Sequence, residues 1–425
     1  MRYMELYEGD SFVMIANSDK PRNLKIAFVI GLQVPFQGAA WRRIEFFARY
    51  LSLKKFNVYV ISPRTLYLAC SEFAKDRKSE SRGRTLFKLI TVPLMLHVCK
   101  SRLLTSILEV VSSLFSGILL LLIKPKIIVL SIPPHQYLIG TYLASRLSRA
   151  KLIVDLRDPI DISYVKHYAR YQALKTLMRI ARTIEYSALY KASAILYVSE
   201  VMAKDLSRTM PPLSMKMHLV PNGADLTVYR PLGKTKMGKP GVFKLFFMGR
   251  FLEHINFSVI LKALSILKSK HLNVKLYIAG TLDPVLYDEA KKLGVQDSIV
   301  YLGLLSANEL VTVMNEMDLA VLPYYNDKNY RCSLPAKFYE YIACGLPILV
   351  SAPLYFEVAR IVRDHGIGIW CPAEDVSCIV NAIMQLYKDR NKLMALAEKC
   401  LSFRSGIDRM HSAEKLISII NGFTD

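Results

Sequence analysis

Cysteine pairs at the spacing of a metal site or a disulfide-rich domain are missing from this 425-residue chain. The seven cysteines form no Cys-x-x-Cys motif, and their odd number and irregular spacing predict neither a zinc site nor a disulfide framework. This pattern is typical of a protein in a reducing cytosol. The chain also starts without the apolar core of a signal peptide, and we expect residues 1–24 to form a polar N-terminal arm.

Acidic residues are scarce as well. With 35 Asp and Glu against 57 Lys and Arg, the formal net charge is +22. Such an excess fits three kinds of partner: nucleic acid, anionic lipid or phosphorylated substrates. The sequence contains no RRM, KH, zinc-finger or basic-zipper signature, so we predict no nucleic-acid partner. The hydrophobic content of 52% argues against disorder and implies a sizeable core or contact with a membrane.

Strand-like and helix-like patterns alternate along the first half of the chain. Residues 24–33 predict a strand, residues 38–55 carry apolar side chains at a helical period, and residues 56–63 predict a second strand. This β-α-β unit opens an α/β sheet. Further strands and helices are predicted in 125–147, 150–159, 192–206 and 217–231. We therefore expect an N-terminal Rossmann-like domain over residues 25–231.

The second half repeats this alternation after a Gly-, Pro- and Lys-rich linker, residues 232–241. An amphipathic helix is predicted at 257–269, and strands are predicted at 242–250, 274–280, 299–303, 319–323 and 347–351. A second Rossmann-like domain is thus expected over residues 242–405. The predicted fold class is α/β, with two Rossmann-like domains facing each other across a cleft. Ligands in such sheets bind at the carboxyl ends of the strands.

One apolar segment, residues 103–123, contains a single charge, Glu109, and is long enough to span a bilayer. We do not favour a span, because the segment lies inside a regular α/β pattern. Its flank is basic, with Asp76 and Glu80 against Lys75, Arg77, Lys78, Arg82, Arg84, Lys88, Lys100 and Arg102. We expect residues 75–123 to dock on an anionic membrane surface. The alternative is a crossover helix that the sheet buries.

Near the C-terminus, the sequence SLPAKFYEYIACGLPILVS predicts a helix that begins near residue 335, ends at Gly345 and precedes a buried strand. Lys337 lies in the first turn of this helix, and Glu340 follows one turn later. A helix N-terminus beside a cation suits an anion such as a diphosphate, and a carboxylate can accept hydrogen bonds from ribose hydroxyls. The alternative is a surface Lys–Glu pair that contributes only tenths of a kcal/mol.

Several motifs in order make the chain similar to a known family. They are PNGADLTVYRP (221–231), FMGRF (247–251), YIAG (277–280), YLGLLSANELVTVMNEMDLAVLPY (301–324) and PAKFYEYIACGLPILVS (335–351). Together with the two Rossmann-like halves they resemble glycosyltransferase family 4, whose members are retaining enzymes of the GT-B fold. The resemblance covers about residues 25–405 and is closest to the branch that extends surface or lipid-linked glycans. It implies that the C-terminal helix, residues 406–425, crosses back to the first domain.

The resemblance implies a donor site in the second domain. Glu340 would bind the donor ribose, Arg250 after Gly249 would contact the diphosphate, and Leu304 would hold the base through its backbone. Tyr341, next to Glu340, is a further residue expected to bind the sugar-nucleotide donor.

Two other motifs complete the positions that the resemblance assigns. Gly38 matches the glycine loop near the donor phosphates. The motif of Asn222, Gly223 and Asp225 matches a strand end near the interdomain hinge.

Two family positions are altered in this chain. The first glutamate of the family's E-x7-E pattern is replaced by Cys332, and the family's diphosphate lysine is replaced by Ile255, beside His254. Lys337 could supply the missing positive charge. These departures leave open a catalytically weak protein that binds sugar nucleotides or acts as a scaffold.

The expected acceptor side lies in the first domain, where SIPPHQ and VDLRDP follow strand ends. The candidates there are His135, Asp155, Arg157 and Asp158. The alternatives are a structural histidine and aspartates that cap helices.

The sequence thus predicts a retaining, metal-independent hexosyltransferase-type enzyme that moves a sugar from a nucleotide sugar to a glycan. We expect a lipid-linked acceptor and a cytoplasmic protein, peripheral to the inner face of the cell membrane. Arg250, Lys337, His135 and Asp158 are the predicted catalytic residues. No cofactor is predicted besides the donor, and the chain lacks an Asp-x-Asp metal motif at these strands. Another GT-B enzyme with a soluble acceptor is the alternative, and the sequence makes no prediction of oligomeric state.

Overall fold

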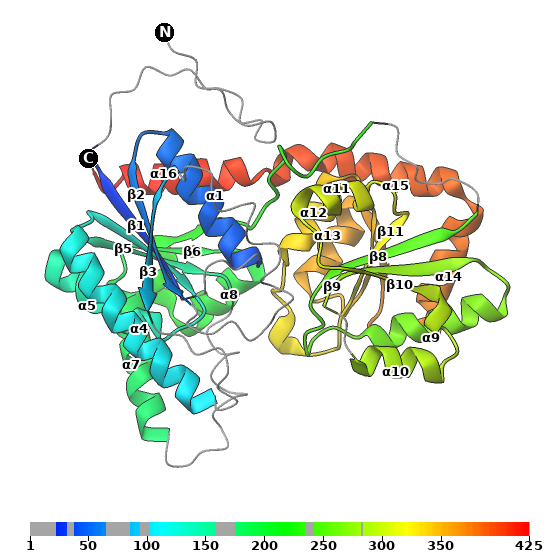
Figure 1. The fold of residues 1–425 in the computed structure, drawn as a ribbon, viewed down its shortest axis with the longest axis horizontal. Helices are drawn as coiled ribbons and strands as arrows, with labels where there is room; N and C mark the ends of the chain where they lie inside the picture. Colours follow the sequence, from blue (N-terminus) through cyan, green and yellow to red (C-terminus); the bar gives the residue numbers. More distant parts are fainter. Residues whose placement is uncertain are drawn as a thin grey trace, which may run out of the picture. The chain divides into compact units, whose positions relative to one another are not determined.

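The structure is a computed structural model, which describes residues 23–31, 38–64, 86–93, 102–158, 175–233, 241–281 and 284–424. The polar arm before residue 23, the central part of the linker and most of the basic flank before residue 102 lie outside these ranges. The described chain forms two compact units, each built on its own parallel sheet (Figure 1).

The N-terminal unit contains a seven-stranded parallel sheet of order β3-β2-β1-β4-β5-β6-β7. Its strands are β1 Lys25–Ile30, β2 Asn57–Arg64, β3 Lys88–Pro93, β4 Ile127–Ile132, β5 Lys151–Leu156, β6 Ala194–Tyr197 and β7 Met217–Leu219. Its helices are α1 Ala39–Leu53, α4 Arg102–Ile123, α5 Tyr137–Ser148, α7 Lys175–Lys191, α8 Glu200–Thr209 and the 3-10 turn η2 Pro211–Lys216. The central strands β1 and β4 are buried almost throughout, as expected for a sheet covered on both faces.

The C-terminal unit contains a six-stranded parallel sheet of order β10-β9-β8-β11-β12-β13. Its strands are β8 Phe243–Gly249, β9 Val274–Gly280, β10 Ile299–Gly303, β11 Leu319–Pro323, β12 Ile348–Ser351 and β13 Gly368–Cys371. Its helices are α9 Phe257–Ser269, α10 Pro284–Lys292, α11 Ala307–Met314, α12 Ala336–Ala343, α13 Glu357–His365, α14 Val376–Lys388 and α15 Arg390–Phe403, with 3-10 turns η3 Gln296–Ser298, η4 Lys328–Tyr330 and η5 Arg404–Ile407. The α/β class and the two Rossmann-like sheets predicted from the sequence are confirmed.

Within the described residues the chain passes from one unit to the other after Pro221 and again after His411. Residues 222–231, which we expected in the first domain, group with the C-terminal unit. There the Arg409 guanidinium donates to the carbonyls of Asn222 and Gly223 at 2.9 and 3.0 Å. The last helix, α16 Arg409–Asn421, starts in the C-terminal unit and from residue 412 onward groups with the N-terminal unit.

Helix α4 has an unusual distribution of side chains. Its small polar residues Ser112, Ser113 and Ser116 are fully buried. Leu120 is also buried, but five large apolar residues of the helix are exposed: Ile107, Leu114, Phe115, Ile118 and Leu122. The buried face packs closely on α5, as expected for a crossover helix, and the other face remains apolar and exposed. Among the described residues, no helix combines the length and apolarity needed to cross a membrane.

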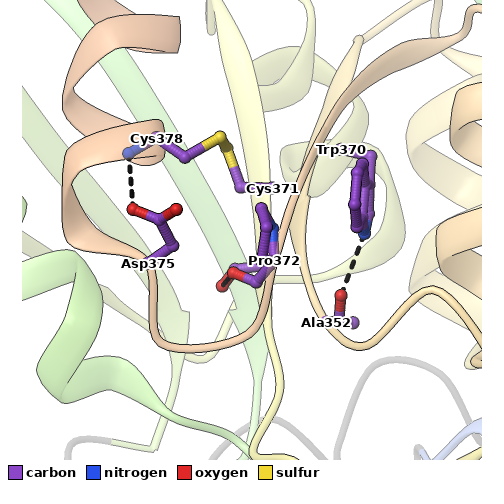
Figure 2. Close-up of a disulfide and its surroundings, with 7 residues drawn as sticks. Ala352, Trp370, Cys371, Pro372, Asp375 and Cys378 are labelled. Atoms are coloured by element: carbon purple, nitrogen blue, oxygen red, sulfur yellow. Dashed lines mark hydrogen bonds between the residues drawn. A yellow bond between two sulfur atoms is a disulfide. The ribbon is translucent and has the colours of Figure 1, made fainter.

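A disulfide joins Cys371, at the end of β13, to Cys378, in the first turn of α14 (Figure 2). The expectation that the chain forms no disulfide is wrong for this pair. The loop between them folds back because Asp375 caps α14, its carboxylate accepting a hydrogen bond from the Cys378 N–H at 2.8 Å. This turn brings the two Cα atoms to 5.7 Å, within the range of a disulfide. Spacing in the sequence does not reveal such a turn.

Candidate functional site

Two glycines end neighbouring strands at the carboxyl edge of the C-terminal sheet. Strand β8 ends at Gly249 and β9 at Gly280, both at positive φ, +114° and +138°. A Cβ atom on Gly280 would lie 2.2 Å from the Gly249 carbonyl oxygen, so only glycine allows these strand ends to approach. The Tyr301 hydroxyl donates to the Gly280 carbonyl at 2.6 Å and fixes this edge. These half-buried glycines lie at the edge where parallel sheets bind ligands.

Helix α12 starts beside this edge. Pro335 is its N-cap residue, in extended conformation, and the helix ends before Gly345, which has a φ of +74°. The sequence predicted both boundaries to within a residue. The N–H groups in the first turn of a helix have no carbonyl partner within the helix. Such groups are typical of an anion site, although they do not define one by themselves.

Lys337 lies directly over the end of β8. Its Nζ atom is 3.8 Å from the centre of the Phe247 ring, and it would be 3.2 Å from a Cβ atom on Gly249. Burial lowers the pKa of Lys337 to about 7, and the nearby Glu340 carboxylate opposes this shift. Two residues predicted from separate motifs, Gly249 and Lys337, therefore lie close together at this edge.

Glu340 and Tyr341 lie deeper. Both are fully buried, and the Tyr341 hydroxyl accepts a hydrogen bond from the Met248 N–H at 2.9 Å. That hydrogen bond links α12 to β8, so Tyr341 has a structural role at the site. Arg250 and Leu304 are exposed after β8 and β10, on the same edge of the sheet.

The two altered family positions are both packed in the interior. Cys332 is buried in the segment between β11 and α12, and Ile255 is buried where its backbone bridges to Tyr324. Neither side chain offers a charge to a ligand.

In the N-terminal unit, Asp155 pairs with Arg43, a residue that the sequence did not single out. The Arg43 guanidinium donates to the two Asp155 oxygens at 2.9 and 3.3 Å and to the carbonyls of Val220 and Pro221 at 2.8 and 2.7 Å. Ser131 donates to the same carboxylate at 3.0 Å. Both charged side chains are buried, so Asp155 holds α1 to the sheet and we no longer propose it as an acceptor contact.

His135 is also turned inward. Its Nδ1 atom lies 2.6 Å from Glu185 Oε1 on α7, and both side chains are buried. Glu109 on α4 is electrostatically coupled to His135, and burial raises the Glu109 pKa to about 7. Glu185 is the acidic residue that sequence reasoning missed, because a helix with several charges does not show which of them is buried.

The other predicted residues of this unit lie at its loops. The Arg157 guanidinium donates to the Pro133 carbonyl, and burial lowers the Arg157 pKa against the opposing effect of Asp158 and Asp155. Asp158 is exposed. Gly38 is the N-cap residue of α1, and its carbonyl accepts from the Arg42 N–H at 3.1 Å.

Two Rossmann-like units with parallel sheets define the GT-B class, and solved structures share this fold. Sucrose-phosphate synthase from Thermosynechococcus elongatus aligns with a TM-score of 0.72 at 13% identity, over 95% of this chain and 99% of that one. The glycosyltransferase WaaG, involved in lipopolysaccharide biosynthesis, gives 0.64 at 17% identity, over 93% and 100%. Anabaena HepE in complex with UDP and glucose gives 0.67 at 14%, over 94% and 100%.

The family match falls on the half of the chain that carries the candidate donor site. Residues 234–400 match the model of the family described as Glycosyl transferases group 1. The D-inositol 3-phosphate glycosyltransferase of Arthrobacter sp. (strain FB24) is 26% identical over 182 residues, which is 40% of this chain and 42% of that protein. Putative glycosyltransferase EpsF of Bacillus subtilis (strain 168) is 26% identical over 163 residues, 36% and 39% respectively. The chain therefore matches less than half the length of these relatives. The resemblance to a GT-B glycosyltransferase is confirmed.

Proposed function

We propose that this protein transfers a sugar, with retention of configuration, from a nucleotide sugar to a lipid-linked glycan at the cytosolic face of a membrane. The observation that carries the donor half of the proposal is Lys337, held over Gly249 at the first turn of α12. A similar fold has been solved with UDP and glucose, which supports a sugar nucleotide as the ligand.

The reaction needs positive charge at the leaving group. As the glycosidic bond breaks, charge builds on the nucleoside diphosphate. Lys337, Arg250 and the N–H groups that start α12 lie at one edge of one sheet, where they can stabilise that charge without reorganising. This arrangement supports a metal-independent mechanism, in which the acceptor oxygen attacks from the leaving-group side.

The membrane half of the proposal rests on α4. Five large apolar side chains are exposed on one face of this helix, and Leu122 is 73% exposed. The exposed cations Lys124 and Lys126 follow the helix, and the basic flank of residues 75–102 precedes it in the sequence. Apolar side chains beside lysines and arginines suit a bilayer surface rich in anionic lipid.

The donor half is tested by thermal shift with a panel of nucleotide sugars and free nucleotides. A true donor raises the melting temperature by mass action. Lys337→Ala should weaken donor binding by about tenfold or more, because one hydrogen bond to a charged group is lost. Lys291→Ala, on the exposed end of α10, is the control and should leave binding unchanged. Equal donor affinity of Lys337→Ala and the parent protein would remove Lys337 from the site.

The membrane half is tested by sedimentation with vesicles. We expect binding to vesicles with anionic lipid and weak binding to vesicles of phosphatidylcholine alone. The double variant Ile118→Ser/Leu122→Ser should bind less, whereas Met215→Ser, at a fully exposed methionine on η2, should not. Unchanged sedimentation of the double variant would refute docking through α4.

The buried Cys332 favours one second candidate, a sugar-nucleotide-binding scaffold with weak turnover. Intact donor binding without product from any lipid-linked acceptor would favour it over the transferase.

A further inference from the structure

A groove with a volume of about 280 Å³ lies between α5 and α7 of the N-terminal unit. Six side chains line it: Ile139, Tyr142 and Leu143 from α5, and Thr183, Ile184 and Ser187 from α7. None of the six is fully buried, so a ligand can reach them from solvent. Because a cavity of about 150 Å³ already takes up benzene, this groove has room for a stretch of hydrocarbon chain.

The groove continues the apolar surface of α4. Helix α5 packs against both α4 and α7 (Figure 1), and all three helices run parallel because they connect parallel strands. Ile118, Leu143 and Ser187 each lie in the last turn but one of their helix, so they are at a similar height above the amino edge of the sheet. Leu143 is 49% exposed, and Leu147, one turn further along α5, is 73% exposed. The exposed apolar face therefore extends from α4 across α5 to the groove.

Positive charge lies at the amino-edge end of this surface. Exposed cations occur at or just after the ends of the three helices, and they are Lys124, Lys126, Arg146, Arg149 and Lys191. Within the bounds of these helices the sequence has two acidic residues, Glu109 and Glu185, and neither is exposed. Cations are common at the C-terminal ends of helices because they interact with the helix dipole, so alone they do not indicate a ligand. Beside an apolar groove, they match the phosphate and the hydrocarbon chain of an anionic lipid.

Two of these cations share helix faces with the groove. Arg146 lies one turn after Leu143 on α5, and Lys191 lies one turn after Ser187 on α7. Side chains one turn apart are neighbours on the surface of a helix, so both cations extend the walls of the groove. A hydrocarbon chain in the groove would place a charged headgroup at the helix ends, within reach of both.

We propose that this groove binds one acyl chain of an anionic phospholipid from the membrane, while Arg146 and Lys191 bind the phosphate of that lipid. The inference rests on the membrane half of the proposed function and adds a defined lipid site to the exposed face of α4. The lipid is a component of the bilayer and not the acceptor, because the two cations lie toward the amino edge of the sheet, whereas substrates of such sheets bind at the carboxyl edge. A lipid held in this way fixes which face of the N-terminal unit lies on the membrane.

Soluble short-chain lipids test the site without a bilayer. Titration calorimetry compares dihexanoyl phosphatidylglycerol, kept below the concentration at which it forms micelles, with its dibutanoyl homologue, with dihexanoyl phosphatidylcholine and with glycerol phosphate. The dihexanoyl form should bind about tenfold more tightly than the dibutanoyl form, because each methylene that enters the groove contributes up to about fourfold. The phosphatidylcholine should bind more weakly, and glycerol phosphate should not bind measurably. Equal affinity for the two chain lengths would show that the chain stays outside the groove and would overturn the inference.

A variant that fills the groove tests its position. Ser187→Phe places a ring in the groove and should lower the affinity for dihexanoyl phosphatidylglycerol by about tenfold or more, since the chain loses its apolar contacts. Ser214→Phe, at an exposed serine on η2, is the matched control and should bind as the parent protein does. Parent-like affinity of Ser187→Phe would contradict the assignment.

A charge variant tests the headgroup contacts. Arg146→Gln/Lys191→Gln should bind phosphatidylglycerol no better than phosphatidylcholine. Lys291→Gln/Lys292→Gln, a pair of exposed lysines on α10, should retain the parent's preference. If the Arg146→Gln/Lys191→Gln protein also retains it, these two cations do not bind the phosphate and the proposal is wrong.

Other outcomes separate this inference from its rivals. If the protein dimerises in analytical ultracentrifugation and Ser187→Phe abolishes the dimer, the groove joins two copies of the chain and the lipid site is refuted. If the parent protein sediments with anionic vesicles through α4 but binds no soluble lipid, this inference fails and the proposed function stands. If the soluble lipid binds and vesicles do not, the membrane half of the proposed function fails and the lipid site stands.

Discussion

The buried pair of Arg43 and Asp155 allows one prediction with a magnitude taken from the structure. Replacing Asp155 by Asn removes the negative partner of a guanidinium that is 1% exposed. The two contacts with residue 155, at 2.9 and 3.3 Å, lose their negative charge, and the Arg43 cation is left with neutral acceptors alone: the new amide oxygen and the carbonyls of Val220 and Pro221. An uncompensated buried charge costs about 3–5 kcal/mol, so we expect Asp155→Asn to lower the free energy of unfolding of the N-terminal unit by that amount.

The two tryptophans of the chain make this measurable for one unit alone. Trp41 is on α1, two residues before Arg43, and Trp370 is on β13 of the other unit. In a Trp370→Phe background, tryptophan fluorescence during urea unfolding reports the N-terminal unit only. The control is Lys54→Ala, which breaks an exposed pair with Glu414 and should cost no more than about 1 kcal/mol.

Two outcomes would contradict this reasoning. A loss below about 1 kcal/mol for Asp155→Asn would mean that the pair contributes no more than a surface salt bridge. The double variant Arg43→Met/Asp155→Leu should be much less destabilised than Asp155→Asn, because apolar replacements leave no buried charge. If it unfolds as easily as the single variant, the cost comes from packing and not from charge.

Three further predictions concern packing, pH and redox state. Gly140→Ala should lower the free energy of unfolding of the N-terminal unit by about 1–3 kcal/mol, because the added Cβ would lie 2.0 Å from the Ser113 carbonyl oxygen of α4. Gly406→Ala, where a Cβ would meet open space, is the control and should be neutral. Urea unfolding measures both variants. Because the pKa of Lys337 is depressed in the folded state, the unfolded state binds more protons between about pH 7 and pH 10, so the C-terminal unit should gain stability as the pH rises through that window. Lys337→Met should flatten that profile in melts monitored at several pH values. Peptide mapping without reduction should find Cys371 joined to Cys378, and two free thiols at these positions would contradict the disulfide. In urea unfolding, Cys371→Ser should lower the stability of the C-terminal unit by about 2 kcal/mol, as expected for a disulfide that closes so short a loop.

Alternation of apolar runs and helical periods predicted both sheets, because buried parallel strands must be continuously apolar and their crossover helices amphipathic. The boundaries of α12 followed from Pro335 and Gly345, whose preferred backbone conformations act locally. The contact between Lys337 and the end of β8 also agrees with the motifs, since parallel strands bring their carboxyl ends to one edge.

Position along the chain could not show which charged residues are buried. Asp155 lies near the carboxyl end of β5, where a ligand-binding residue would be expected, yet Arg43 neutralises it from 112 residues away. The domain boundary differed for a related reason, since Arg409 holds residues 222 and 223 from the far end of the sequence. The residues near a charged side chain in the sequence do not show which distant residue will pair with it.

The sequence by itself determined the fold class, the strands other than β3 and β13, and the edge of the sheet at which a ligand is expected to bind. These follow from local backbone preferences and from burial, which act on neighbouring residues. Only the tertiary structure decided that α4 buries its serines while Leu114 and Leu122 are exposed, that Cys371 meets Cys378, and that His135 meets Glu185. Each of these depends on which turns and faces meet in space, and the energy of such contacts is set by packing between segments.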